Sequence, residues 1–239
     1  MLIEIWSDVV CPWCYVGKRR FETALAGFAK RDEVEVVWRA FELDPHATTP
    51  APGDEGADYA ERLAAKYGTT RDGAQQMLDS MTATAATEGL DFRFERAHAA
   101  NTFAAHQVLH LALERGVQDA VKERLMRAYF TEGEPVGDRD TLVRLAAEAG
   151  LEAAEVEKAL DTEEYAAAVR ADEEQARAYG ISGVPFYVVD GRYGVSGAQP
   201  AEQLLAVLDT AWSEAHPGLT VLPTADGVAE ACGPDGCAL

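Results

Sequence analysis

Cysteine and basic residues are both scarce in this sequence. Only 4 of its 239 residues are cysteine, too few for a scaffold held together by disulfides, and closely spaced cysteines in such a chain are typical of redox chemistry or metal binding. Lys and Arg number 21 against 41 Asp and Glu, a formal net charge of −20. A field of that sign repels phosphate backbones and anionic lipid, so neither nucleic acid nor a membrane is expected as a partner.

Long apolar runs are missing as well. No stretch of the sequence reaches the ~18 uninterrupted apolar residues that a membrane span needs. Residues 1–8 contain neither a basic leader nor the apolar segment of a signal peptide. We therefore expect a cytoplasmic protein, and its apolar fraction of 48% is ample for a buried core.

Strand patterns occur near both ends of the chain. Four short segments are rich in β-branched or aromatic residues and predict strands: 2–6, 34–41, 186–189 and 193–196. The last two are separated by Asp190-Gly191, a turn pair favoured in two-residue hairpins. Helices are predicted from residue 11 and over 200–215. The order β-α-β, followed much later by β-β-α, is that of the thioredoxin fold.

The middle of the chain is helical in pattern. Apolar periodicity, interrupted by glycines that suit helix C-termini, predicts these helices: 58–67, 71–88, 97–115, 117–131, 138–149, 152–160 and 163–179. We expect an α/β protein with a discontinuous thioredoxin-like domain. Residues 1–46 and 180–215 form that domain. Residues 47–179 form a large all-helical insertion subdomain, and residues 216–239 form a flexible tail.

The motif Cys11-Pro12-Trp13-Cys14 lies at the junction between the first strand and the first helix. A sulfur at a helix N-terminus lies near unpaired N–H groups and the positive end of the helix dipole, which favours the thiolate and lowers its pKa. We expect Cys11 to be this attacking thiolate and Cys14, one turn further on, to be the resolving thiol. Pro12 suits the first helical position because its missing N–H would be unpaired there.

A second pair of cysteines, Cys232 and Cys237, encloses the turn-forming segment Gly-Pro-Asp-Gly. We interpret it as a second redox pair, while idle thiols, a tethering disulfide and a zinc site made by all four cysteines stay open. The strand-to-helix context of Cys11 and Cys14 favours redox chemistry. No metal is expected, and no cofactor beyond the dithiol, with glutathione left open as a co-substrate.

Val184-Pro185 begins the strand that follows the helical segment. An ordinary X-Pro bond is trans, but in the thioredoxin arrangement this position lies against the dithiol. We therefore expect a cis bond, with the backbone before the proline turned toward a substrate.

Charged residues flank the dithiol on both sides. Glu4 and Asp8 could relay protons to the resolving thiol, or be solvated carboxylates at the end of a strand. Lys18, Arg19 and Arg20 could hold an acidic peptide or a glutathione carboxylate, although a solvated helix face is the expected role.

Other polar and sulfur-containing side chains occur in the helical part. His106 and His110 have a spacing that can hold a metal, but no supporting acidic partner pattern accompanies them, so we expect them and Asn101 to face a cleft. Met77 and Met81 are expected in the core.

Four stretches together resemble the FrnE-like branch of the DsbA family, and the match covers nearly the whole chain. They are 5–21 (IWSDVVCPWCYVGKRRF), 38–43 (WRAFEL), 101–106 (NTFAAH) and 180–185 (GISGVP). The resemblance implies a thioredoxin-like fold with a helical insertion, redox chemistry carried by Cys11 and Cys14, and a cis-proline at Pro185.

We therefore predict an enzyme that forms, reduces or isomerises disulfides in proteins or small thiol compounds, and the resemblance is consistent with a homodimer. The alternative is a glutathione-dependent transferase or isomerase, because 2-hydroxychromene-2-carboxylate isomerases and kappa-class glutathione transferases share the fold. Those relatives typically have serine where this chain has Cys11, which favours redox chemistry here. A zinc-binding interaction module is a third class.

Overall fold

A four-stranded sheet in the order β2-β1-β3-β4 forms the centre of the computed structural model, which describes residues 1–50 and 58–217. The strands are β1 (Leu2–Ser7), β2 (Glu35–Ala40), β3 (Phe186–Val189) and β4 (Tyr193–Ser196). β1 runs parallel to β2 and antiparallel to β3, and β3 pairs antiparallel with β4 across Asp190-Gly191. The predicted strands and their thioredoxin order are confirmed.

Alternation along β1 decides which helices cover which face of the sheet. Ile3 and Ile5 lie in a buried cluster with side chains of α1 (Pro12–Gly27) and α9 (Ala201–Ala215). Successive side chains of a strand point to opposite faces, and Trp6 accordingly packs on the other side, where its Nε1 donates to the carbonyl of Asp172 in α8 (Ala166–Ala178) at 2.9 Å. The sheet therefore lies between two helical layers.

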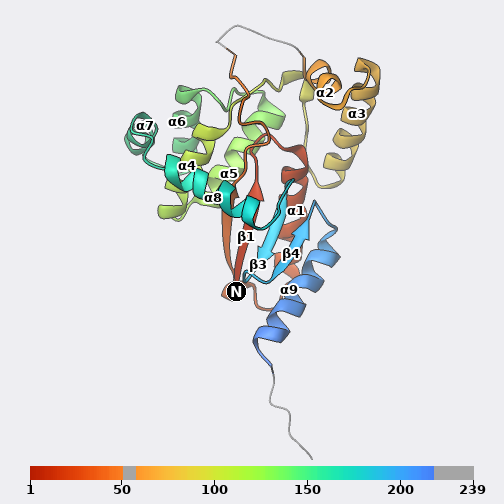
Figure 1. Ribbon diagram of the computed structural model, residues 1–239, viewed down its shortest axis with the longest axis vertical. Coiled ribbons are helices and arrows are strands. Elements are labelled where there is room, and N and C mark those ends of the chain that lie inside the picture. The colour runs from red at the N-terminus through yellow and green to blue at the C-terminus, as the bar shows by residue number, and fades with distance from the viewer. Residues whose placement is uncertain (51–57, 218–239) are drawn as a thin grey trace, which may run out of the picture.

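The other helices gather at the end of the sheet where α1 begins. They are α2 (Tyr59–Tyr67), α3 (Arg71–Thr87), α4 (Phe103–Glu114), α5 (Gln118–Arg127), α6 (Arg139–Glu148) and α7 (Ala153–Asp161). In Figure 1, α2 and α3 stand on one side of this end, and α6 and α7 stand on the other. Within the described ranges, no helix has the length and apolarity needed to cross a membrane.

Most predicted helices agree with the observed ones within a few residues, but one was wrong in extent. The helix predicted over 97–115 begins only at Phe103, whose N–H is capped by the side chain of Asn101 at 3.0 Å. The helix predicted over 117–131 has the expected extent, but its end is a π-helical turn (Ala128–Glu132), where the carbonyl of Phe130 accepts from Arg93 at 2.7 Å.

Glycines end the helices as the sequence predicted. Gly68, for example, has a φ of 62° and follows α2, and its N–H donates to Ala64. This left-handed conformation satisfies a terminal carbonyl at little steric cost for glycine.

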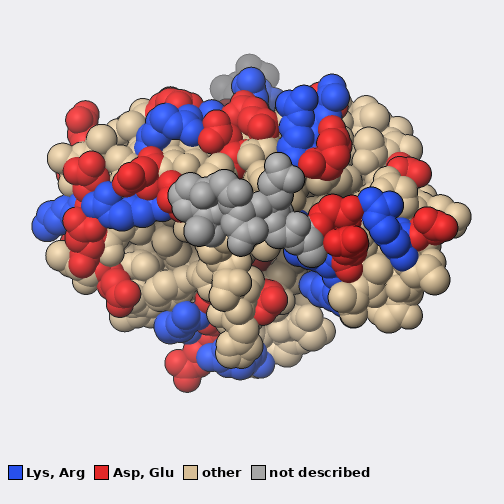
Figure 2. Space-filling model, turned by 90° about the horizontal axis from the view of Figure 1, so that it is seen from above, with Lys and Arg blue, Asp and Glu red and all other residues tan. Residues whose placement is uncertain are grey.

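Charges of both signs are interspersed on the face shown in Figure 2, so neither sign forms a continuous patch there. Ion pairs between helices account for part of the charge of the molecule: Arg139 with Asp161 joins α6 to α7 at 2.7 Å, and Arg115 with Glu155 joins α4 to α7 at 3.0 Å. Exposed pairs of this kind contribute little to stability.

Close packing of α1 on the strand β3 predicts that Gly17→Ala destabilises the protein. A Cβ on Gly17 would lie 2.6 Å from Tyr187 Oη and 2.9 Å from Pro185 Cγ. Overpacking of this kind typically costs about 1–3 kcal/mol, whereas the better helix propensity of alanine offsets only about 1 kcal/mol. We expect the free energy of unfolding, measured by urea denaturation, to fall by about 1–2 kcal/mol.

Gly27→Ala in the same helix is the matched control. Its Cβ would meet nothing closer than Leu205 Cδ2 at 3.5 Å, so the stability should stay unchanged or rise by up to about 1 kcal/mol. Equal losses in the two variants would contradict the packing argument.

Candidate active site

The dithiol lies where β1 passes into α1. Cys11 is the N-cap of α1 and Pro12 its first residue, so the predicted helix start is confirmed. The Cys14 N–H donates to the Cys11 carbonyl at 3.0 Å, which places both sulfurs on the first turn. Both are free thiols; Cys11 is 4% exposed and Cys14 is fully buried. Trp13, between them, is 46% exposed.

The Val184-Pro185 loop lies directly against Cys11. The peptide bond between these two residues is cis, as the sequence analysis expected. The Cys11 thiol donates to the carbonyl of Val184, with 3.7 Å between sulfur and oxygen. The backbone before the proline is thus in contact with the first sulfur of the motif.

The two thiols influence each other's ionisation. Interaction with Cys14, together with burial, raises the pKa of Cys11 well above its usual value. Burial also acts to raise the pKa of Cys14, but interaction with Cys11 and the positive charge of Lys122 outweigh it and lower the pKa. The pair thus shares one ionisation, and a lowered pKa at Cys11 itself stays a prediction.

Asp8 lies buried beside this pair, on the turn between β1 and α1. Its Oδ2 accepts from the Leu43 N–H at 2.8 Å, and Oδ1 lies 3.5 Å from His106 Nε2. Burial acts to raise the pKa of Asp8, but the hydrogen bond and charge of His106, the Leu43 N–H and the charge of Lys122 outweigh it, so the pKa is lowered. Asp8 thus stays an anion close to the dithiol.

Glu4 does not reach the dithiol, and the expectation that it could relay protons is wrong. Its Oε1 accepts from Arg39 Nη2 on β2 at 2.6 Å. As an even-numbered residue of β1 it shares the sheet face of Trp6, whereas Ile3 and Ile5 pack toward α1. The pleat of the strand separates Glu4 from the cysteines.

Lys18, Arg19 and Arg20 are neither solvated nor available to bind an acidic ligand. Lys18 is 1% exposed and is ion-paired with three carboxylates: Glu22, Asp119 and Glu123. Arg19 pairs with Glu22 and Glu123, and Arg20 with Glu88 at 2.6 Å. These cations tie α1 to the neighbouring helices.

The two histidines of α4 lie beside different carboxylates. His106 faces Asp8, and His110 Nε2 lies 3.0 Å from Asp172 Oδ2. Among the described residues, no group of three or more His, Cys, Asp and Glu could hold a metal ion. Cys232 and Cys237, on which the second redox pair and the zinc alternative depend, lie outside the described residues.

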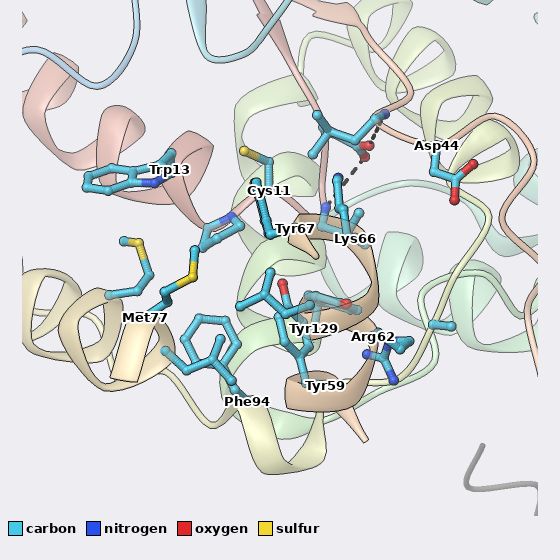
Figure 3. A pocket seen from close by; sticks show the side chains of 18 of the residues that line it. Cys11, Trp13, Asp44, Tyr59, Arg62, Lys66, Tyr67, Met77, Phe94 and Tyr129 are labelled. Carbon is cyan, nitrogen blue, oxygen red and sulfur yellow. Dashed lines mark hydrogen bonds between the residues drawn. The ribbon is translucent and has the colours of Figure 1, made fainter. Parts of the chain in front are cut away.

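A cleft with a volume of about 1140 Å³ opens beside Cys11. Apolar and aromatic side chains of α1, α2 and α3 line much of it: Trp13, Tyr59, Leu63, Tyr67, Met77 and Met81. Figure 3 shows Cys11 and Trp13 on one side, with Met77, Phe94 and Tyr59 across from them. Cys14 is not in the lining, so only the first sulfur of the motif meets this space.

The prediction that Met77 lies in the core is wrong, because Met77 is 43% exposed at this cleft. Met81 is 7% exposed, as predicted.

Basic side chains of α2 also line the cleft. They are Lys66 and Arg62, and Arg62 donates to the Ala97 carbonyl at 2.9 Å.

Sequence reasoning missed Lys122, which is fully buried near the dithiol. The signal was present, because the buried residues of α5 are Gln118, Val121, Lys122, Leu125 and Met126, the spacing of an inward-facing stripe. A lysine in the middle of such a stripe is unusual, since lysine is almost never fully buried unless it is paired.

Comparisons with known proteins agree with this geometry. The family model for the DsbA-like thioredoxin domain matches residues 2–209. The crystal structure of a probable DsbA oxidoreductase from Streptomyces coelicolor is 48% identical and has a TM-score of 0.82, with 100% of this chain and 99% of that chain covered. An uncharacterised protein of Bacillus subtilis, YwbO, is 32% identical over 166 residues, which are 68% of this chain and 73% of its own.

A more distant structure shares the fold. It is the cytosolic disulfide reductase DsbM from Pseudomonas aeruginosa with GSH, at 19% identity and a TM-score of 0.61, with coverage of 89% of this chain and 99% of that chain.

The lowered pKa of Asp8 predicts a pH-dependent loss of stability in Asp8→Asn. A carboxyl whose pKa is lowered by folding stabilises the native state above its unfolded value of about 3.9 and loses this contribution as pH falls through the folded value. We expect the free energy of unfolding of the reduced protein to be lower by about 1–2 kcal/mol at neutral pH. The difference from wild type should shrink below about pH 4.

Urea denaturation over a series of pH values measures both effects. Asp209→Asn, an exposed carboxyl on α9, is the control and should change the stability by less than about 0.5 kcal/mol. A loss in Asp8→Asn that is the same at every pH would show that packing, not charge, is responsible.

Proposed function

The chain belongs to the DsbA-like thioredoxin domain family and is an enzyme of the disulfide oxidoreductase and isomerase class; from that premise we propose that it exchanges thiols and disulfides through the dithiol Cys11-Pro12-Trp13-Cys14. Cys11 is the attacking thiol and Cys14 the resolving thiol. Val184 and Pro185 form the surface against which the substrate sulfur lies.

One observation carries this proposal: only Cys11 of the two sulfurs meets the cleft, and Cys14 lies behind it. Accessibility therefore selects Cys11 as nucleophile, although the lowered pKa is that of Cys14. The two sulfurs share the first turn of α1, so transfer of one proton from Cys11 to Cys14 makes the accessible sulfur the thiolate. The N-terminus of α1 supports the charge there.

The exchange takes place in two steps. The Cys11 thiolate attacks one sulfur of a substrate disulfide, and the other substrate sulfur leaves as a thiolate. Cys14 then attacks the Cys11 sulfur of the mixed disulfide and displaces the second substrate sulfur, which leaves with the proton that Cys14 gives up. Two electrons pass from the enzyme dithiol to the substrate, and the reverse sequence oxidises a substrate dithiol.

We propose glutathione as the small co-substrate, and we propose that the protein is a cytoplasmic, FrnE-like reductase or isomerase. The DsbM structure with GSH supports the choice of glutathione, because a protein of the same fold, 19% identical to this chain, has GSH with it. The cleft is large enough for a peptide segment or a drug-sized molecule besides, because ligand pockets typically have volumes of about 300–1,000 Å³. Its apolar lining favours a substrate with apolar groups next to the disulfide.

Glutathione-dependent isomerisation or transfer on a small electrophile is the alternative function. The paired sulfurs speak against it, since that chemistry needs one activated sulfur or hydroxyl and no resolving thiol. The two functions differ in a measurable way: redox turnover changes the number of free thiols, and isomerisation leaves it constant.

Cysteine variants test the proposal directly. With a disulfide-containing peptide as substrate and glutathione as reductant, Cys11→Ser should lower turnover at least ~1000-fold, because the nucleophile is gone. Cys14→Ser should accumulate a mixed disulfide on Cys11, since its resolving sulfur is missing. Intact mass and peptide mapping identify the adduct and its position.

Cys14→Ala is the control for the serine hydroxyl and should trap the same adduct. Turnover that persists in Cys11→Ser, or an adduct formed first on Cys14, would refute the assigned roles. Isomerisation of a small electrophile at a constant thiol count, with no exchange of peptide disulfides, would favour the alternative.

A further inference from the structure

Two buried lysines lie over the same aromatic ring, yet their surroundings differ. Lys18 Nζ is 6.0 Å and Lys122 Nζ 5.6 Å from the centroid of Trp38. Lys18 is ion-paired with three carboxylates. Lys122 Nζ has one hydrogen bond, a donation to the Ser7 carbonyl at 3.3 Å, and no carboxylate of the described residues lies within ion-pairing distance.

A fully buried ammonium without a counter-ion is unfavourable by several kcal/mol, so the negative charge that offsets it must come from elsewhere. The Ser7 carbonyl that accepts from Lys122 is at the end of β1, directly before Asp8 and four residues before Cys11. The charges that act on Lys122 are those of Cys14, Asp8, Cys11 and Lys18. Asp8 is already held by Leu43 and His106. Cys14 is fully buried and can ionise to a thiolate, and Lys122 is the cation whose charge lowers its pKa.

We propose that Lys122 is the counter-ion of the reduced dithiol, a positioning residue in the helix α5 that stabilises the thiolate of the Cys11-Cys14 pair. This deepens the proposed function and rests on it. Burial lowers the pKa of Lys122 to about 8, against the opposing effect of Cys14, Asp8 and Cys11, so the ammonium keeps its proton more readily when the thiolate is present. Each charge stabilises the other.

The charge balance of the redox step follows. In the reduced enzyme the pair carries one negative charge, which the ammonium offsets. The negative charge leaves with the first substrate thiolate when Cys11 forms the mixed disulfide. The Cys14 proton leaves with the second substrate sulfur when Cys14 closes the disulfide, so the oxidised pair carries no charge and Lys122 loses its partner. Lys122 therefore stabilises the reduced form relative to the disulfide, and only at pH values where the pair is ionised.

Lys122→Met in the full-length chain is the decisive variant. In the disulfide form there is no thiolate for Lys122 to offset, so the oxidised variant should fold with a stability equal to or above that of wild type. The reduced variant should be less stable than reduced wild type at neutral pH, because one partner of a buried charge pair is missing. The pH midpoint for alkylation of Cys11 by iodoacetamide, followed by peptide mass, should rise by at least about one unit, a tenfold change in the ionisation constant.

The equilibrium with glutathione should shift in the same variant. At pH 7, where Lys122 keeps its charge, we expect the Cys11-Cys14 disulfide to be favoured at least ~10-fold more than in wild type. As the pH falls and the dithiol of both proteins takes up its proton, the difference should shrink. A purely structural role of the lysine would not produce this dependence on pH.

Lys18→Met is the matched control, since it removes the other lysine over Trp38. It leaves carboxylates without a cation and should reduce stability, with the Cys11 midpoint unchanged. Unaltered alkylation and glutathione equilibria in Lys122→Met would overturn the inference while leaving the proposed function intact. Failure of wild type to exchange disulfides at all would instead refute the proposed function.

Discussion

The electrostatic interaction between the two thiols in the first turn of α1 is the constraint on which the chemistry of this site depends. Only Cys11 meets the cleft, and a negative charge on either sulfur opposes a second one on its neighbour. The groups around the pair act on that single charge. The helix N-terminus favours an anion on Cys11, whereas the buried cation of α5 favours one on Cys14, and Asp8 opposes a second negative charge at Cys11.

The arrangement requires parts of the chain that are far apart in sequence. The sulfurs come from the β1-α1 junction, the proline loop from the start of β3, and the cleft wall from α2 and α3. The sheet aligns the first two because β1 and β3 are neighbours, with Trp6 opposite Phe186. The helices between β2 and β3 complete the site, since they supply both the aromatic wall and Lys122.

Much of the fold could be predicted because its signals are local. Strand composition, the hairpin at Asp190-Gly191 and glycines after helices are set by short-range backbone preferences. The helix expected over 97–115 begins later than its apolar periodicity indicates, because Asn101 caps it from within that range; the cap is itself a local signal. The π-helical turn after Arg127 could not be predicted in this way, because it depends on Arg93, a residue distant in sequence.

The candidate site could be predicted where a short motif fixes the positions of its residues. It could not be predicted where contacts between distant parts of the chain fix the surroundings of a side chain. Cys11, Cys14 and the cis bond before Pro185 followed from position in the fold. The position of Glu4 is decided by its pairing with Arg39 on the neighbouring strand. The sharing of charge between Cys11 and Cys14 depends on groups such as Lys122 that are distant in sequence. The inward-facing stripe of α5 predicts that Lys122 is buried, but its contact with the Ser7 carbonyl at the end of β1 is seen only in the folded chain.

The central claim is that Cys11 and Cys14 form one two-electron redox unit. Equilibration of the full-length protein in glutathione buffers of graded potential, with acid quenching and peptide mapping of each cysteine, tests it most directly. We predict that Cys11 and Cys14 are oxidised together in a single transition, joined to each other by a disulfide. Independent glutathionylation of the two cysteines, or a pair that stays reduced across the whole range, would contradict the account.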